Sequence, residues 1–193
     1  MDIKRNLAKL LTSLLPVSKA RRKVLCIKLR SWLYIRGLRK RVKFGRDIRI
    51  ERKCEFTPGS EVGDRSKVTQ IHVYGMGKVK IGKNCRLSWG LRVHTSNHDY
   101  HGEFLPFGDG NVIKDVEIGD FVWIGSDVLL LPGTKIGEGS IIQGGSVVHG
   151  VIPPCSIAGG NPAKVFATRD AEKFAHLKAE GRFLPHTKGW DFR

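Results

Sequence analysis

Three histidines lie close together in one short stretch of the chain: His94, His98 and His101. A neutral imidazole, with an unperturbed pKa of about 6.5, can take the proton of a hydroxyl or amine as that group attacks a thioester carbonyl. Imidazoles can also bind a zinc-type metal ion, in which case His94 and His98 would need a third ligand such as His72. Proton transfer needs only one well-placed histidine, so we favour it and expect no metal.

The histidines interrupt a repeat of six residues. A period of six fits neither an amphipathic helix nor an alternating strand, but it fits a parallel β-helix in which three hexapeptides make one coil. The anchors point inward and stack on those of the next coil: Ile81, Leu87 and Val93 before the interruption, and Ile118, Ile124, Leu130, Ile136, Ile142 and Val148 after it.

The interruption must leave the coil as a loop, which we expect to protrude over residues 99–115. A loop held at both ends by a rigid scaffold is a natural place for chemistry. His94 follows an inward anchor by one residue, so we expect it to point out of the coil. His98 and His101 are the candidates for the chemistry of the loop.

The repeat resembles the left-handed β-helix of the hexapeptide-repeat acyltransferases. Three segments are similar to the maltose, galactoside and xenobiotic acetyltransferase branch: TSNHD at residues 95–99, FVWIGS at 121–126 and GGSVVHGVIPPCSIAGGNPAKVF at 144–166. The resemblance covers about Val68 to Ala167. It implies an all-β solenoid, a left-handed parallel β-helix over residues 47–167.

In this branch the histidine that matches His98 is the general base. Asn97 and Asp99 flank His98, so either side chain is a candidate to orient its ring, and His101 is the alternative base. The resemblance also implies acetyl-CoA as the acyl donor, bound by Trp123, Gly125, Ser126, Gly144, Gly145, Asn161, Pro162, Ala163 and Lys164. The chain departs from many relatives at His149 and Gly150, where they have Thr and Lys.

The resemblance implies an acetyl-CoA-dependent O-acetyltransferase that modifies a sugar hydroxyl of a cell-surface polysaccharide or its precursor, and a homotrimer. Amino-sugar N-acetylation, xenobiotic acetylation and a longer acyl donor remain open. A non-catalytic β-solenoid or a carbonic-anhydrase-like protein is the other alternative. The histidine spacing here is four and three residues, and it does not reproduce the pair five residues apart of those zinc enzymes.

Most of the formal net charge of +16 belongs to residues 1–46, which hold 15 Lys and Arg and one acid, Asp2. Leucines at helical spacing predict an amphipathic helix from Ile3 to Leu15, ended by Pro16, and a second helix runs from about Lys19 to Lys40. Basic helices of this kind suit an anionic membrane surface, and packing against the protein is the alternative. Nucleic acid is less favoured because no recognition motif accompanies the charge.

The 193-residue chain has no apolar stretch long enough to span a membrane or to serve as a signal peptide, so we expect a cytoplasmic protein, peripheral at the inner face of the cell membrane if the extension binds lipid. Its four cysteines are scattered without CxxC spacing and predict reduced thiols. Residues 168–193 form the expected C-terminal tail. Its helix, from Asp170 to Glu180, is expected to pack across the last coil and protect its open sheet edge.

Overall fold

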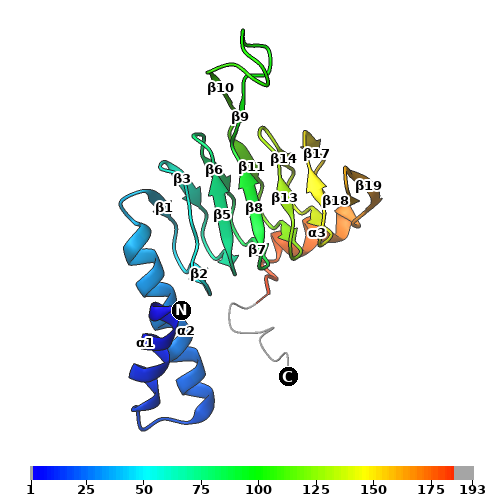
Figure 1. Cartoon of the computed structure of the whole chain (residues 1–193). Coiled ribbons are helices and arrows are strands. Elements are labelled where there is room, and N and C mark those ends of the chain that lie inside the picture. The colour runs from blue at the N-terminus through cyan, green and yellow to red at the C-terminus, as the bar shows by residue number, and fades with distance from the viewer. Residues whose placement is uncertain (1, 185–193) are drawn as a thin grey trace.

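The computed structural model describes residues 2–184. They form a solenoid of about six turns with three parallel sheets as its faces (Figure 1). The repeat of six predicts this parallel β-helix, and its left-handed form is the one that the resemblance implies. The chain passes repeatedly from sheet A to sheet B, then to sheet C and back to sheet A.

Each sheet is described by its strands in spatial order. Sheet A contains β1 (Val42–Phe44), β3 (Ser60–Val62), β6 (Val79–Ile81), β11 (Val116–Ile118), β14 (Lys135–Ile136) and β17 (Val151–Ile152). Sheet B contains β2 (Arg49–Ile50), β4 (Lys67–Val68), β7 (Arg86–Leu87), β12 (Trp123–Ile124), β15 (Ile141–Ile142), β18 (Ser156–Gly160) and β19 (Ala163–Thr168). Sheet C contains β5 (Ile71–Tyr74), β8 (Leu91–His94), β13 (Leu129–Leu130) and β16 (Val147–Val148).

The hexapeptide anchors form the core. All nine anchors are buried, and anchors of successive coils lie side by side in the sheets, as Ile118 does with Ile136. The register continues across the interruption, because Ile81 pairs directly with Ile118. The loop is therefore an insertion between two coils that still stack, and the scaffold on both sides of it stays rigid.

The interruption leaves the solenoid as a two-stranded antiparallel ribbon, β9 (Ser96–His98) and β10 (Asn111–Ile113) (Figure 1). At its neck the amide of Lys114 donates a hydrogen bond to the carbonyl of Thr95, at 2.9 Å. Thr95 is itself buried, and its hydroxyl donates to the carbonyl of Tyr74 at 2.9 Å. The ribbon is thus tied to sheet C at its base.

Two antiparallel helices precede the solenoid, α1 (Ile3–Ser13) and α2 (Lys19–Leu38), which confirms the two helices expected there. Helix α2 packs on the first coil: the Ser31 hydroxyl donates to the carbonyl of Ile50 at 3.0 Å, and the amide of Ile50 donates back to it at 3.2 Å. Tyr34 joins the solenoid core. The first strand, β1, starts at Val42, earlier than the boundary expected after residue 46.

The expectation for the C-terminal edge was wrong. Strand β19 turns back and pairs antiparallel with β18, so a strand covers the edge of sheet B. Helix α3 (Ala171–Ala179), capped by Asp170, instead lies along the outer side of sheet B, with Phe174 at 5.8 Å from Phe121 between ring centroids. A turn at Gly160 allows the strand to fold back, and the edge gains backbone hydrogen bonds that a helix would not supply. The part of the expected tail after residue 184 lies outside the described residues.

Cys54 and Cys85 are buried in the core, and desolvation raises the pKa of each thiol to about 12. A thiol with such a pKa stays protonated and unreactive near neutral pH. None of the helices between residues 2 and 184 combines the length and the apolar character needed to cross a bilayer.

Candidate active site

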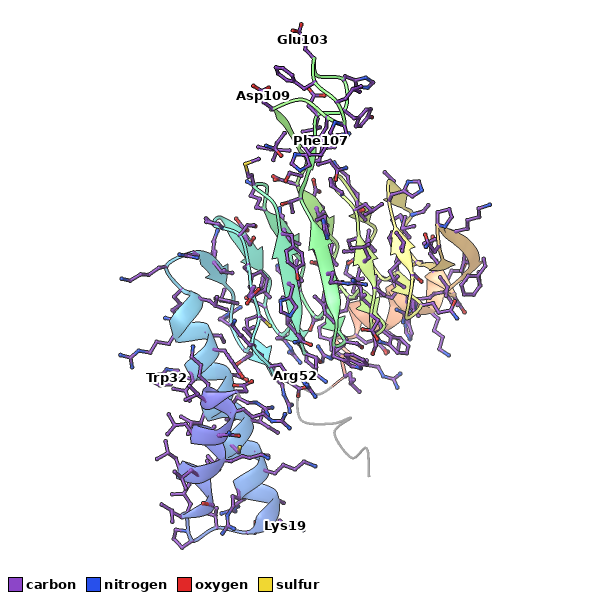
Figure 2. All side chains as sticks on the ribbon, viewed as in Figure 1. Lys19, Trp32, Arg52, Glu103, Phe107 and Asp109 are labelled. Atoms are coloured by element: carbon purple, nitrogen blue, oxygen red, sulfur yellow. The ribbon has the colours of Figure 1, made fainter. Side chains whose placement is uncertain are left out.

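His98 ends strand β9 at the end of the ribbon away from the solenoid, where it pairs with Asn111 of β10 and the loop begins. Its ring stacks on Phe107, with 3.8 Å between centroids and 6° between planes. Phe107 lies nearer the solenoid than Glu103 at the tip of the loop (Figure 2). The stacking fixes the plane of the imidazole while the residue stays exposed to solvent. A base held this way can meet a substrate hydroxyl without reorganisation.

Asp99 and Asn97, the two residues expected to orient the His98 ring, make other contacts. The Asp99 carboxylate accepts a hydrogen bond from the amide of His101 at 3.0 Å, and the Asp99 carbonyl accepts one from the amide of Gly108 at 2.8 Å. Asn97 lies opposite Val112 in the ribbon. Within residues 2–184 neither side chain hydrogen-bonds the His98 ring, so Asp99 shapes the loop. Phe107 was not among the predicted site residues, although it belongs to the apolar segment FLPF of the otherwise polar loop.

The other histidines are placed differently. His101 lies further along the loop, exposed, with its ring 4.3 Å from that of Tyr100. His94 points out of the coil, as expected, and its ring packs at 5.2 Å on Tyr74. The His72 ring nitrogen Nδ1 lies 3.2 Å from a carboxylate oxygen of Glu55. Among residues 2–184 no group of three or more His, Cys, Asp or Glu side chains could hold a metal ion.

Apart from Trp123, the residues predicted to bind the donor lie at or beside one corner of the solenoid, which we call the B–C corner: the turns at residues 125–128, 143–146 and 159–162, after strands of sheet B. A Cβ on Gly125 would lie only 2.5 Å from the backbone nitrogen of Gly144, so the coils can stack this closely only with glycine. The amide of Gly145 donates to the carbonyl of Ser126 at 2.8 Å. Gly145 has a φ of +74° from which a Cβ would meet nothing within 4 Å, so its outer side is open.

The next turn continues the B–C corner. Asn161 and Pro162 form the connection between β18 and β19, Ala163 pairs with Gly160, and Lys164 is exposed opposite Gly159. The Ser146 hydroxyl donates to the carbonyl of Gln143 at 2.6 Å and accepts from the amide of Gly160 at 3.2 Å. Ser146 therefore ties the turns of two successive coils together. It was not among the predicted site residues, although its small size and repeat position were visible.

Trp123 is 54% exposed on the outer face of sheet B. It borders a cavity of about 440 Å³ between sheet B and α3, whose other walls include Arg86, Phe121, Arg169 and Phe174. His98 does not line this cavity. The ribbon leaves the solenoid where sheet C passes to sheet A, and the glycine turns lie where sheet B passes to sheet C. One chain therefore places the predicted base and the predicted donor site on opposite edges of sheet C.

The uninterrupted part of the solenoid is similar to a known family. The model of the family described as bacterial transferase hexapeptide (six repeats) matches residues 115–150. Over these residues the chain carries the repeat of that family, and proteins named as acetyltransferases are similar to the chain in sequence and in fold.

A putative lipopolysaccharide biosynthesis O-acetyl transferase from Escherichia coli is 32% identical over 103 residues, covering 49% of this chain and 53% of that protein. A maltose O-acetyltransferase from Clostridium difficile has a similar structure, with 27% identity, a TM-score of 0.61 and coverage of 86% and 87% of the two chains. A galactoside acetyltransferase in complex with coenzyme A shares the fold at 24% identity and a TM-score of 0.62, covering 89% of this chain and 82% of the other. The chain spans about half the length of the curated relatives it matches.

Proposed function

We propose that this hexapeptide-repeat protein is an acetyl-CoA-dependent O-acetyltransferase that acetylates a sugar hydroxyl of a cell-surface polysaccharide or its precursor, with His98 as the general base. The observation that carries the proposal is the stacked, solvent-facing imidazole of His98 at the loop end of a ribbon that is fixed to a rigid solenoid. The names of similar proteins, which include O-acetyltransferases of galactosides and maltose, support the reaction type.

The donor fits the B–C corner. Coenzyme A needs an elongated site where its pantetheine arm can lie close to backbone amides, and glycine turns without side chains allow that approach. Gly145 faces open space, and the exposed ammonium of Lys164 on the next turn suits a phosphate of the nucleotide end. A galactoside acetyltransferase with this fold binds coenzyme A, which agrees with the assignment.

The reaction is a direct transfer. A ring nitrogen of His98 takes the proton of the acceptor hydroxyl as the oxygen forms its bond to the thioester carbonyl carbon. The carbon–sulfur bond breaks, coenzyme A leaves as the thiolate, and the imidazolium returns its proton to the sulfur. The Gly145 amide already donates to Ser126, so the Ser126 amide is the better candidate to stabilise the oxyanion.

The separation of the two half-sites supports a homotrimer. His98 and the B–C corner lie on opposite edges of sheet C in one chain, so a neighbouring copy can bring its glycine turns to the ribbon. In this arrangement each reaction centre combines the base of one protomer with the donor site of the next. Such a trimer would act in the cytoplasm, where acetyl-CoA is available.

The first test is coenzyme A release from acetyl-CoA with a panel of sugars, amino sugars and lipid-linked oligosaccharides. We expect turnover with a hydroxyl acceptor, and the His98→Ala variant should lose about 10²- to 10⁴-fold in kcat, the usual contribution of a placed general base. His101→Ala is the matched control, because it removes an exposed histidine of the same loop, and it should keep the wild-type rate.

The outcomes separate the alternatives. Turnover that survives His98→Ala but not His101→Ala would move the base to His101. Turnover only with amino sugars would assign N-acetylation. Failure of every acceptor together with no binding of acetyl-CoA would overturn the enzyme assignment and favour a non-catalytic solenoid.

A further inference from the structure

Helix α1 turns its leucines away from the protein. The residues that pack against α2 are small or polar, since Ala8 and Thr12 are buried. Ile3, Leu10 and Leu14 on the outer side are 72%, 62% and 78% exposed. A helix of a water-soluble domain normally buries its apolar stripe, so the orientation of α1 needs a reason.

The orientation is fixed by specific contacts. The Tyr34 hydroxyl of α2 donates a hydrogen bond to the Asp2 carboxylate at the start of α1. The Lys4 ammonium lies over the Tyr34 ring, 5.6 Å from its centroid. At the other end the Arg22 guanidinium donates to the carbonyl of Leu15 at 3.0 Å. These contacts hold α1 at both ends with its leucines pointing outward. The exposed row of apolar side chains on α1 is therefore fixed by the packing of the hairpin.

The same hairpin carries the positive charge of the protein. Residues 1–46 hold 15 Lys and Arg. The single acid among them is Asp2, whose carboxylate accepts a hydrogen bond from the Tyr34 hydroxyl. On α2, Trp32 is 51% exposed, and the guanidinium carbon of Arg36 lies 5.1 Å from its ring centroid. Lys19 lies at the far end of the hairpin and Trp32 on its side, both away from the solenoid (Figure 2). An exposed aromatic ring beside arginine, on a hairpin that also exposes leucines, suits a lipid headgroup boundary.

We propose that the α1–α2 hairpin docks the protein on the surface of an anionic lipid bilayer, with Ile3, Leu7, Leu10 and Leu14 in the acyl boundary and the cations against the headgroups. Charge complementarity selects this occupant, because each basic side chain near such a surface adds attraction. A second hairpin of the same chain would bring two strongly positive surfaces together. A nucleic acid would pair with the cations but leave the leucines in water.

The test uses the full chain and sedimentation with vesicles of phosphatidylglycerol and phosphatidylcholine, compared with phosphatidylcholine alone. We expect binding to the anionic vesicles only, weakened by salt. The Leu7→Gln/Leu10→Gln/Leu14→Gln variant keeps the charge and should bind at least about tenfold more weakly, because the apolar contact is lost. Arg21→Gln/Lys28→Gln, which removes two exposed cations, should also weaken binding.

Two matched variants control for unspecific effects. Met76→Gln/Val151→Gln removes exposed apolar side chains from the solenoid, and Lys80→Gln/Lys83→Gln removes exposed cations there; both should bind as the wild type does. The replaced leucines are exposed, and circular dichroism checks that the helices remain. Acetyl transfer to a soluble acceptor should be unchanged in every variant, so failure of this proposal is distinct from failure of the proposed reaction.

Three results would overturn the proposal. The first is equal sedimentation of the wild type and the leucine variant. The second is a smaller assembly for the leucine variant in the absence of lipid, which would make the stripe an interface between copies of this chain. The third is no binding to anionic vesicles together with tight binding of duplex DNA that the leucine variant retains.

Discussion

At the scale of single residues, one ring decides where the proposed base points. Phe107 stacks on His98 with the two planes nearly parallel, and it comes from the far side of the loop. The carboxylate of Asp99, the neighbouring acid, is engaged by the His101 amide. The imidazole is therefore positioned by an aromatic face, and its ring nitrogens are left to the substrate.

Removing the aromatic ring of Phe107 should displace the imidazole of His98, the proposed base. We expect Phe107→Ala to lower kcat by about ten- to hundredfold with the KM for acetyl-CoA unchanged, because a small displacement of a catalytic group is costly while the donor corner is untouched. Phe107→Tyr keeps the stacking and should restore most of the rate. Steady-state kinetics measures both variants. Tyr100→Ala removes an exposed aromatic of the same loop as a control, and an equal loss there would refute a specific role for Phe107.

At the scale of elements, stacking of successive coils positions the donor corner. The turns after β12 and β15 approach so closely that a Cβ on Gly125 would lie 2.5 Å from the nitrogen of Gly144 and 2.8 Å from its Cα. Backbone atoms of a coil cannot move aside independently, because each strand is hydrogen-bonded to both neighbours. The coils can lie this close together at the B–C corner only because Gly125 has no Cβ.

We therefore expect Gly125→Ala to lower the free energy of unfolding by about 1–3 kcal/mol, the usual cost of overpacking, and to weaken acetyl-CoA binding as well. Urea denaturation and calorimetric titration measure the two effects. Gly110→Ala is the control, since a Cβ there would be 3.6 Å from Asp99, an ordinary contact, and the variant should stay within about 0.5 kcal/mol of the wild type. Similar losses in both variants would contradict the close-approach argument.

At the scale of the whole molecule, the proposed base and the proposed donor corner lie on opposite edges of sheet C, and the basic hairpin lies on the other side of the solenoid from the ribbon (Figure 1). In a single chain the proposed base would therefore have no donor site beside it. A trimer would complete three centres and would also present three hairpins to one surface, which multiplies a weak affinity for lipid.

Mixed trimers test the shared site. One chain carries His98→Ala, and the other carries Trp123→Ala/Lys164→Glu, which weakens the donor side. If each centre joins two protomers, random mixing in equal amounts should restore about a quarter of the wild-type activity, since three quarters of the trimers are mixed and each has one intact centre. Coenzyme A release after refolding the chains together measures the recovery. No recovery, with mixed trimers shown by mass, would place the whole site in one chain.

The sequence by itself determined the solenoid, the two N-terminal helices and the protruding loop. Anchors such as Ile118 and Ile136 specify the coil because a period of six depends only on local side-chain type, and each anchor stacks on the next. The tertiary structure decided what depends on contacts between distant segments. The stacking of Phe107 on His98, the return of β19 over the edge of sheet B and the outward leucines of α1 all arise from pairings that no local pattern encodes.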